Sequence, residues 1–299
     1  MRFARYPKIF RVGHVKAKGV FDKGIIVVEE KMDGANVRWM YDEEQDIIRF
    51  GSRNSELTNA KDFNQFKKFA EWVKQLDVND LEPNMIYYAE YMIPHTIQYD
   101  WDKVPMLLGF DVYNPCEKNP HFVSYDKSVE LFEALGVQFV PIIDVVHSSE
   151  ITKNYLDKVI PESKYYNGKA EGVVFKNYEC QKFAKLVAEE FKEVNEKVFG
   201  TSPKRFKETQ PERYLLEKYV TPRRVEKVIR QLISEGYELN MSLMSVLPQR
   251  VWQDVIEEEA FNIFKENLTF NPKQFARLIP KRCVNVLQRC IALKEIDAF

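Results

Sequence analysis

A lysine followed by an acidic turn, Lys31-Met32-Asp33-Gly34, carries the first candidate chemistry in this sequence. The β-branched run Ile25-Ile26-Val27-Val28 before it is typical of a strand, and Asp33-Gly34 is a turn that leads into a second strand. A lysine attacks an electrophile only as the neutral amine, so burial, a nearby cation or a metal has to lower its pKa. The motif predicts a nucleophilic lysine at a strand end, although so short a motif also fits a solvated lysine beside a hairpin turn.

Two carboxylates far along the chain could serve this lysine. Glu90 stands among aromatic residues in segment 85–92, where a carboxylate has to be paired, bound to a metal or at the rim of a sheet. Glu171 opens the apolar segment 172–176, whose first residue is a glycine. Together with Asp33, these two side chains could hold a hydrated Mg²⁺, a hard cation that keeps its waters and meets phosphates. Each carboxylate alone is also compatible with an ordinary charge at a sheet rim.

Cations and an aromatic residue complete the set. Lys176, Lys182 and Lys185 lie on or beside the last two predicted strands and could neutralise a phosphate. Phe110 could stack on a purine base. The alternative is that the lysines are solvated strand residues and that Phe110 belongs to the core.

The elements that must position these residues are short strands mixed with helices. Strands are predicted in segment 25–53 and at 85–92, 106–113, 137–146, 172–176 and 183–187. Helices are predicted at 124–135, ending at Gly136, and between 149 and 159. Without a regular βαβ alternation, this order indicates an α+β domain with mainly antiparallel sheets.

The character of the sequence changes near residue 200, where Gly200-Thr201-Ser202-Pro203 is typical of a boundary. Helices are predicted to start at Thr221-Pro222, at Pro248, at Asn271-Pro272 and at Pro280, and no strand is predicted in the last hundred residues. We therefore expect two domains, a catalytic one at 1–202 and an all-helical one at 203–299.

Charge is distributed unevenly between these parts. The 299-residue chain has 44 basic and 45 acidic residues, of which residues 200–299 hold 17 and 13. Segment 202–230, with nine Lys or Arg against four Glu, could contact phosphates or form a solvated helix face. The four cysteines include no CxxC pair, and no apolar stretch approaches the length of a membrane span or a signal peptide, so a soluble, cytoplasmic protein without a zinc site is expected.

The ordered set of motifs resembles the covalent nucleotidyltransferases, which include ATP-dependent ligases and mRNA capping enzymes, and within them the RNA ligase 2 family. Lys31-Met32-Asp33-Gly34 matches the motif with the nucleophilic lysine, and the following Ala35-Asn36 is typical of RNA ligases. Gly51-Ser52-Arg53-Asn54, Glu90, Phe110-Asp111 and Glu171-Gly172-Val173-Val174-Phe175-Lys176 match the later motifs in order. The resemblance covers roughly residues 5–190.

Two positions depart from the family pattern. The fifth motif usually has two basic residues flanking one position, whereas Lys182-Phe183-Ala184-Lys185 has two residues between the lysines. Lys185 is the secure match and Lys182 a substitute whose side chain could point elsewhere. Ala89 also replaces a glycine that often precedes the glutamate of the third motif.

The resemblance implies an ATP-grasp-like ligase fold and RNA ligation in three steps. Lys31 would attack the α-phosphate of ATP to form lysyl-AMP, the AMP would pass to an RNA 5′-phosphate, and a 3′-hydroxyl would then join the strands and release AMP. The implied catalytic residues are Lys31, Asp33, Glu90, Glu171 and Lys185. The implied nucleotide-binding residues are Glu30, Lys31, Arg53, Glu90, Phe110, Lys176, Lys182 and Lys185.

Metal and RNA contacts follow from the same resemblance. Asp33, Glu90 and Glu171 would hold Mg²⁺ or Mn²⁺ through water. The implied RNA contacts are Asn36, Arg53, Lys204, Arg205, Arg223 and Arg224, the last four from the basic segment.

Two other functions use many of the same residues. A DNA ligase or a capping guanylyltransferase would share the lysine motif but normally continues into an OB-fold, which needs about five short strands. A catalytically inactive RNA-binding homologue would keep the fold, yet binding alone would not require the whole set of lysines and carboxylates.

Overall fold

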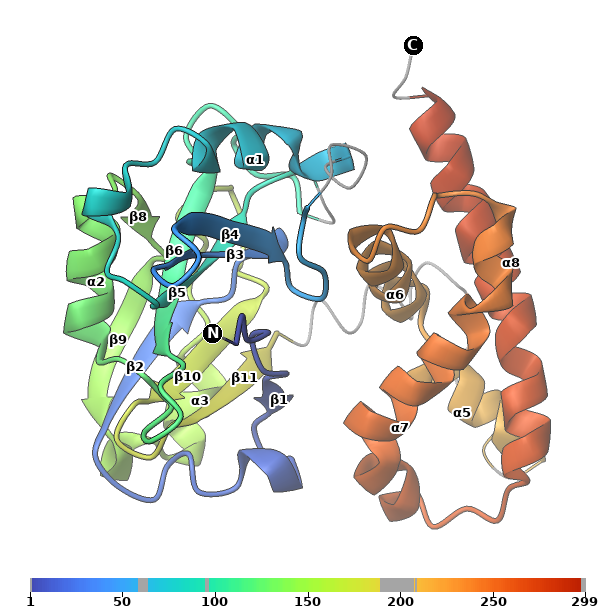
Figure 1. Ribbon diagram of the computed structural model, residues 1–299. Helices are drawn as coiled ribbons and strands as arrows, with labels where there is room; N and C mark the ends of the chain where they lie inside the picture. The colour runs from blue at the N-terminus through green and yellow to red at the C-terminus, as the bar shows by residue number, and fades with distance from the viewer. Residues whose placement is uncertain (1, 59–63, 95–96, 189–206, 208, 297–299) are drawn as a thin grey trace. The chain divides into compact units, whose positions relative to one another are not determined.

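The computed structural model describes residues 2–58, 64–94, 97–188, 207 and 209–296 (Figure 1). The chain divides into two compact units, Met1–Ala188 and Glu189–Phe299. The predicted boundary between residues 202 and 203 lies outside the described residues. The first unit is built from two sheets and the second from helices, which confirms the predicted α+β class with its helical C-terminal part.

The first sheet has the strand order β1-β11-β10-β2-β9. Its strands are β1 (Phe10–Arg11), β11 (Lys182–Val187), β10 (Gly172–Asn177), β2 (Ile25–Glu30) and β9 (Ile142–His147). Only β1 runs parallel to its neighbour, β11, and the other pairs are antiparallel. One face of the sheet packs its alternating apolar residues, Val28 and Phe175 among them, against α3 (Lys153–Lys158). The opposite face therefore carries the intervening residues of each strand.

The second sheet has the order β4-β3-β5-β6-β7, and β8 also pairs with β6. Its strands are β4 (Ile47–Ser52), β3 (Ala35–Asp42), β5 (Ile86–Tyr91), β6 (Leu107–Asn114), β7 (His121–Phe122) and β8 (Gln138–Phe139). The helices α1 (Lys67–Val73) and α2 (Tyr125–Ala134) cover one face, where Trp39, Tyr87 and Phe132 lie in the core. Gly109 is required at this face, since a Cβ there would lie 2.5 Å from the Phe132 ring.

The two sheets meet through the faces that the helices leave uncovered. Lys176 of β10 reaches Asp111 of β6, with 2.8 Å between the ammonium nitrogen and a carboxylate oxygen. The connection from β2 to β3 passes from one sheet to the other and contains Lys31 and Gly34. The first unit therefore presents the lysine motif between two sheets.

The described residues of the second unit form helices joined by turns and contain no strand. Its helices are α5 (Pro211–Tyr219), α6 (Pro222–Ser234), α7 (Leu247–Lys265) and α8 (Pro272–Ile296). The Thr221 hydroxyl accepts a hydrogen bond from the Arg224 N–H and so caps α6, while Val225, Val255 and Phe275 lie in the shared core. Short 3₁₀ helices complete the fold as η1 (Val15–Ala17), η3 (Asn64–Phe66), η4 (Val78–Asp80), η5 (Ser148–Glu150) and η7 (Met241–Ser245).

The structure corrects three predicted elements. Pro280 does not start a helix but lies inside α8, which continues because Ile279 and Cys283 on either side of it are buried in the core. The strand predicted at 137–146 is divided into β8 and β9. The helix predicted between 149 and 159 is divided into η5 and α3.

Candidate active site

Lys31 follows β2 directly and lies beside the start of β10. Its N–H donates to the Gly172 carbonyl oxygen at 2.9 Å, and its Nζ lies 2.6 Å from Oε2 of Glu171. The two side chains are 25% and 19% exposed, so the pair is sheltered but reachable. Gly172 allows β11 to approach β10 closely, because a Cβ at that position would lie 2.1 Å from the Leu186 carbonyl oxygen. The structure therefore brings together Lys31 and Glu171, which are far apart in sequence.

The amine of Lys31 is held in its protonated form. Burial acts to lower its pKa, but the carboxylates of Glu171, Asp33 and Glu90, together with the hydrogen bond to Glu171, outweigh burial and raise the pKa above its ordinary value. The sequence predicts a lowered pKa at a nucleophilic lysine, whereas the carboxylates around Lys31 raise its pKa. Any reaction at this nitrogen needs a change in the charge around it.

Glu90 is placed beside the turn that follows the lysine. Its Oε1 accepts a hydrogen bond from the Gly34 N–H at 3.0 Å, and a Cβ at Gly34 would lie 2.6 Å from the Tyr91 carbonyl oxygen. Burial raises the pKa of Glu90 to about 7, even though Lys31 and the Gly34 N–H act to lower it. A larger residue at position 34 would therefore clash with β5, and the hydrogen bond from the Gly34 N–H to Glu90 holds the turn against that strand.

Asp33 occupies the same turn. Its N–H donates to the Tyr99 hydroxyl at 2.9 Å, and its Oδ2 accepts from the Ile97 N–H at 3.3 Å. These contacts fix the carboxylate close enough to Lys31 to influence its pKa. Asp33, Glu90 and Glu171, the three predicted metal-binding residues, therefore all lie around one amine.

These carboxylates do not form a ready-made cage for a metal ion. Within the described residues, no three or more His, Cys, Asp or Glu side chains lie close enough together to ligate one ion. Their chemistry nevertheless fits a hydrated Mg²⁺ or Mn²⁺, since such ions keep waters and bind through few carboxylates. Water-mediated binding by Asp33, Glu90 and Glu171 remains a prediction.

Lys176 lies deeper, in a buried polar network. Its side chain is 1% exposed, and its Nζ lies 2.7 Å from Glu29, 2.8 Å from Asp111 and 2.6 Å from the Phe110 carbonyl oxygen. We expected this ammonium to neutralise a phosphate, but its contacts are instead with two carboxylates and a main-chain carbonyl. Lys176 therefore joins the two sheets next to Phe110, and its predicted contact with the nucleotide stays a prediction.

Asp111 belongs to the Phe110-Asp111 motif, but its partners Tyr6 and Tyr178, and Glu29 beside Lys176, were not identified from the sequence. Asp111 also accepts hydrogen bonds from the hydroxyls of Tyr6 and Tyr178, which lie near the first and last residues of this unit in the sequence. Burial raises the pKa of Glu29 to about 8, although Lys176 acts to lower it. The available signal was the pair Glu29-Glu30 at the end of a strand, where consecutive side chains point to opposite faces.

Phe110 lies beside the ammonium of Lys176 and is 8% exposed. The Tyr6 ring meets it edge-on with 4.9 Å between centroids, and the Lys176 ammonium lies 5.1 Å from its centroid. The pairing of β5 with β6 shifts register between Tyr88 and Ala89, next to the position that pairs with Asp111. Stacking of Phe110 on adenine remains a prediction.

Glu30 faces away from Lys31. It pairs in register with Val173, which belongs to the core under α3, and it accepts hydrogen bonds from the Ser163 hydroxyl and the Lys164 N–H. Its carboxylate therefore holds the segment that precedes β10. The structure does not bring this side chain to the face that carries Lys31.

Lys182 and Lys185 lie on opposite faces of β11. Ala184 and Leu186 pack in the two core clusters on one face, which places Lys182 on that face and Lys185 on the other. The Lys182 Nζ donates to the Lys18 carbonyl oxygen at 3.0 Å. An odd spacing of three residues along a strand explains why the structure brings only Lys185 to the site face.

The predicted RNA contacts are scattered. Asn36 is the register partner of Glu90 across β3 and β5, and Arg53 donates to the Pro7 carbonyl oxygen at 2.8 Å. Lys204 and Arg205 lie outside the described residues.

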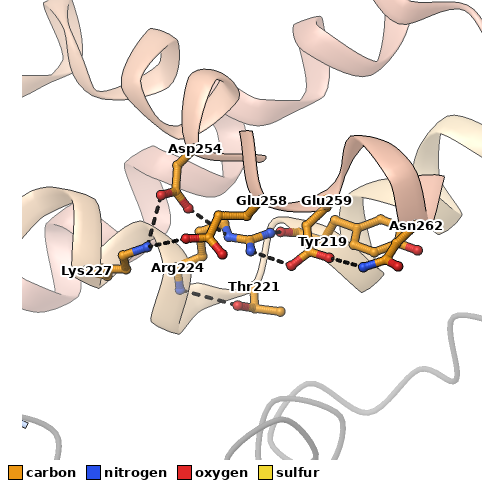
Figure 2. Close-up of polar contacts among 8 residues, drawn as sticks. All are labelled: Tyr219, Thr221, Arg224, Lys227, Asp254, Glu258, Glu259 and Asn262. Atoms are coloured by element: carbon orange, nitrogen blue, oxygen red, sulfur yellow. Dashed lines mark hydrogen bonds and ion pairs between the residues drawn. The ribbon is translucent and has the colours of Figure 1, made fainter. Parts of the chain in front are cut away.

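Arg224 is committed to an ion-pair cluster between α6 and α7 (Figure 2). Its guanidinium lies 3.0 Å from Asp254 and 2.7 Å from Glu259, and its side chain is 10% exposed. Lys227 adds a contact of 2.9 Å with Asp254. This geometry favours a structural role for Arg224 over a contact with RNA, whereas Arg223, which precedes it on α6, remains a prediction.

Comparison with solved structures agrees with the fold. A ligand-free single-residue variant of Naegleria gruberi RNA ligase superposes with a TM-score of 0.50 at 19% identity, covering 66% of this chain and 59% of that one. The same enzyme with pyrophosphate gives a TM-score of 0.49 at 20% identity, covering 66% and 61%. Another variant, solved with ATP and Mn, gives 0.48 at 20%, covering 64% and 58%. The chain thus spans about three fifths of the length of these relatives.

Three further findings come from a search of curated proteins, from the helices of the structure and from a family model. No curated protein matches it. The described helices include none that is long and apolar enough to cross a membrane. The model of the RNA ligase family matches residues 24–187, which is more than half of the chain and contains every residue of the site around Lys31. The chain belongs to the RNA ligase family.

Proposed function

We propose that this protein is an ATP-dependent RNA ligase that joins RNA 3′-hydroxyl and 5′-phosphate ends through a lysyl-AMP intermediate on Lys31. The observation that carries the proposal is the 2.6 Å contact between Lys31 and Glu171, with Asp33 and Glu90 close enough to influence the same amine. A reachable lysine surrounded by carboxylates is suited to receive a nucleotide together with a divalent cation.

The residues divide the chemistry among them. Lys31 attacks the α-phosphate of ATP, a nitrogen–phosphorus bond forms, and pyrophosphate leaves. The adenylyl group (AMP) then passes from Lys31 to the RNA 5′-phosphate, which breaks the nitrogen–phosphorus bond, and attack by the 3′-hydroxyl on that 5′-phosphate joins the strands and releases AMP. Lys185, on the same face of the first sheet, neutralises the α-phosphate. Asn36 and Arg53 contribute to contacts with RNA, and Phe110 to the adenine contact.

The protonated state of Lys31 sets a condition on the first step. Because the surrounding carboxylates hold the proton on the amine, their charge has to be offset before the nitrogen can attack. A divalent cation bound through water at Asp33, Glu90 and Glu171 would supply that positive charge and stabilise the charge that develops on the α-phosphate. The carboxylates that stabilise the protonated amine of Lys31 are thus the same ones that would bind the divalent cation.

The C-terminal part weighs against the alternative of a DNA ligase or capping enzyme. Those enzymes normally continue into an OB-fold of about five strands, whereas the described residues from 209 to 296 form helices and contain no strand. An inactive RNA-binding homologue is disfavoured by the assembled Lys31–Glu171 pair.

The test is transfer of AMP to the protein. ATP carrying radioactive phosphorus at the α-position should label the protein in the presence of Mg²⁺ on a denaturing gel, and GTP should not. Lys31→Ala should abolish the label. Lys23→Ala, which removes an exposed lysine just before the same strand, should retain it.

A second assay separates the proposal from its alternatives. The labelled protein should seal RNA strands with 5′-phosphate and 3′-hydroxyl ends, and DNA strands of the same sequence should be sealed much less well. Folded protein, first freed of any bound AMP, that took up no label from ATP would contradict the ligase proposal and favour the inactive homologue.

A further inference from the structure

The site face of β11 carries one cation where the resemblance to RNA ligases leads us to expect two. Lys185 points to the site face, and the residue two positions later on the same face is Val187, which carries no charge. Lys182 lies on the other face and donates to the Lys18 carbonyl oxygen. The strand itself therefore offers a single ammonium to a substrate with several negative charges.

A second cation stands beside Lys185 on the neighbouring strand. β1 runs parallel to β11, and Arg11 is the register partner of Lys185. A hydrogen bond of 2.9 Å from the Val12 N–H to the Lys185 carbonyl oxygen continues the pairing. Register partners on neighbouring strands lie about 4.8 Å apart and share a face of the sheet.

The packing of the flanking residues confirms which face this is. Phe10 and Val12, on either side of Arg11, pack with Ala184 in a core cluster on the face opposite to Lys185. Alternation along β1 therefore turns Arg11 to the face that carries Lys185. Lys176 lies on the same face and reaches Asp111 of the second sheet. Arg11 therefore borders the space between the two sheets.

The charges on this face are separated. Three carboxylates, Asp33, Glu90 and Glu171, lie around Lys31, whereas Lys185 and Arg11 lie further along the sheet, on β11 and on the edge strand β1. A triphosphate whose α-phosphate lies at Lys31 would be repelled by the carboxylates and attracted toward the two cations. An arginine suits the outer phosphates, because its planar fork can bind two phosphate oxygens at once.

We propose that Arg11 binds the β- and γ-phosphates of ATP, supplying from β1 the second cation that β11 lacks. This inference rests on the proposed function and adds a phosphate-binding residue to it. When the bond between the α- and β-phosphates breaks, the electron pair goes to the leaving pyrophosphate, whose charge Arg11 would stabilise.

The experiment measures the ATP dependence of Lys31 adenylylation in the full-length protein. Arg11→Ala should raise the ATP concentration for half-maximal adenylylation about tenfold, the loss expected when a charge-assisted contact worth about 1.4 kcal/mol is removed. Sealing of RNA that already carries a 5′-AMP should stay within about twofold of wild type, because no β- or γ-phosphate takes part in that step. Lys16→Ala is the matched control, since Lys16 is an exposed cation that lies over the Phe10 ring on the other face.

A double variant that moves the positive side chain to another position on the same face of the sheet distinguishes phosphate binding from a structural effect. Adding Val187→Lys to Arg11→Ala places a cation on the same face, two residues from Lys185, and should recover most of the lost ATP affinity. Recovery would not follow if Arg11→Ala acted by loosening β1, because a lysine at 187 does not restore that strand.

Three results would overturn the inference. First, Arg11→Ala could match Lys16→Ala in its ATP dependence. Second, the defect of Arg11→Ala could be confined to sealing of pre-adenylylated RNA, which would indicate a contact with RNA instead. Third, Val187→Lys could fail to restore the ATP affinity of Arg11→Ala. All three presuppose that wild-type protein is labelled on Lys31. A wild-type protein without label would overturn the proposed function as well, so the two failures are told apart by the wild-type control.

Discussion

Lys176 Nζ and Asp111 Oδ2 lie 2.8 Å apart and link the two sheets of the first unit, with the lysine side chain 1% exposed. Glu29 lies 2.7 Å from the same ammonium. The network thus links β2, which ends directly before Lys31, to β6, which contains Phe110.

Removal of this ammonium should be costly. Lys176→Met leaves Glu29 and Asp111 buried without their cation, and we expect the free energy of unfolding to fall by about 3–5 kcal/mol. Urea unfolding of the two proteins measures the difference. Lys176→Arg, which keeps the charge, should recover part of the loss, and a Lys176→Met protein as stable as wild type would show that the network contributes little.

The raised pKa of Lys31 should be visible without any substrate. An NMR titration of lysine labelled at the ε-carbon should place Lys31 above the ordinary value of 10.5. Glu171→Gln removes a carboxylate that stabilises the ammonium, so the pKa of Lys31 should fall in this variant. A pKa that stays in place after the substitution would mean that Asp33 and Glu90 dominate the field at the amine.

Glu90 should make stability depend on pH. Because burial raises its pKa from 4.5 to about 7, the folded state binds a proton that the unfolded state has already lost between these pH values, and stability falls as pH rises through this window. The full effect is about 3 kcal/mol. Glu90→Gln should therefore gain stability relative to wild type between pH 4.5 and pH 8, as measured by urea unfolding. The exposed Glu117 provides the control, since Glu117→Gln makes the same chemical change at a carboxyl group outside the site.

Arg224 should matter for the stability of the helical unit and not for nucleotide chemistry. Arg224→Ala leaves Asp254 and Glu259 buried without their main cation, and unfolding of this unit should be easier by about 3 kcal/mol (Figure 2). Circular dichroism during thermal unfolding reports the change, while labelling of Lys31 from ATP should keep its wild-type rate. Arg277→Ala, on the exposed face of α8, serves as the control for loss of a positive charge. A loss of RNA binding by Arg224→Ala at unchanged stability would restore the RNA contact that the sequence predicted.

Much of the site could be predicted from the sequence. The lysine motif and the glutamates at 90 and 171 were identified from residue type, order and the strands around them, and the structure places all of them around one amine. Strand alternation also explains two differences. Glu30 precedes Lys31 by one residue and Lys182 precedes Lys185 by three, and both odd spacings place the side chains on opposite faces.

Other features could not be predicted because they depend on partners far away in the sequence. Lys176 is buried because Glu29 and Asp111 reach it from two different strands. Pro280 remains inside a helix because core contacts on either side of it outweigh the hydrogen bond that a proline cannot make.

The sequence by itself determined the chemical groups, their order and the alternation that assigns each to a face of its strand. Those properties are local, since they follow from residue type and from the period of an extended chain. The tertiary structure alone decided which strands are neighbours, and so placed Arg11 beside Lys185 and Glu171 against Lys31. Strand neighbours are chosen by the combined burial of both sheets, a sum over the whole unit that no single segment contains.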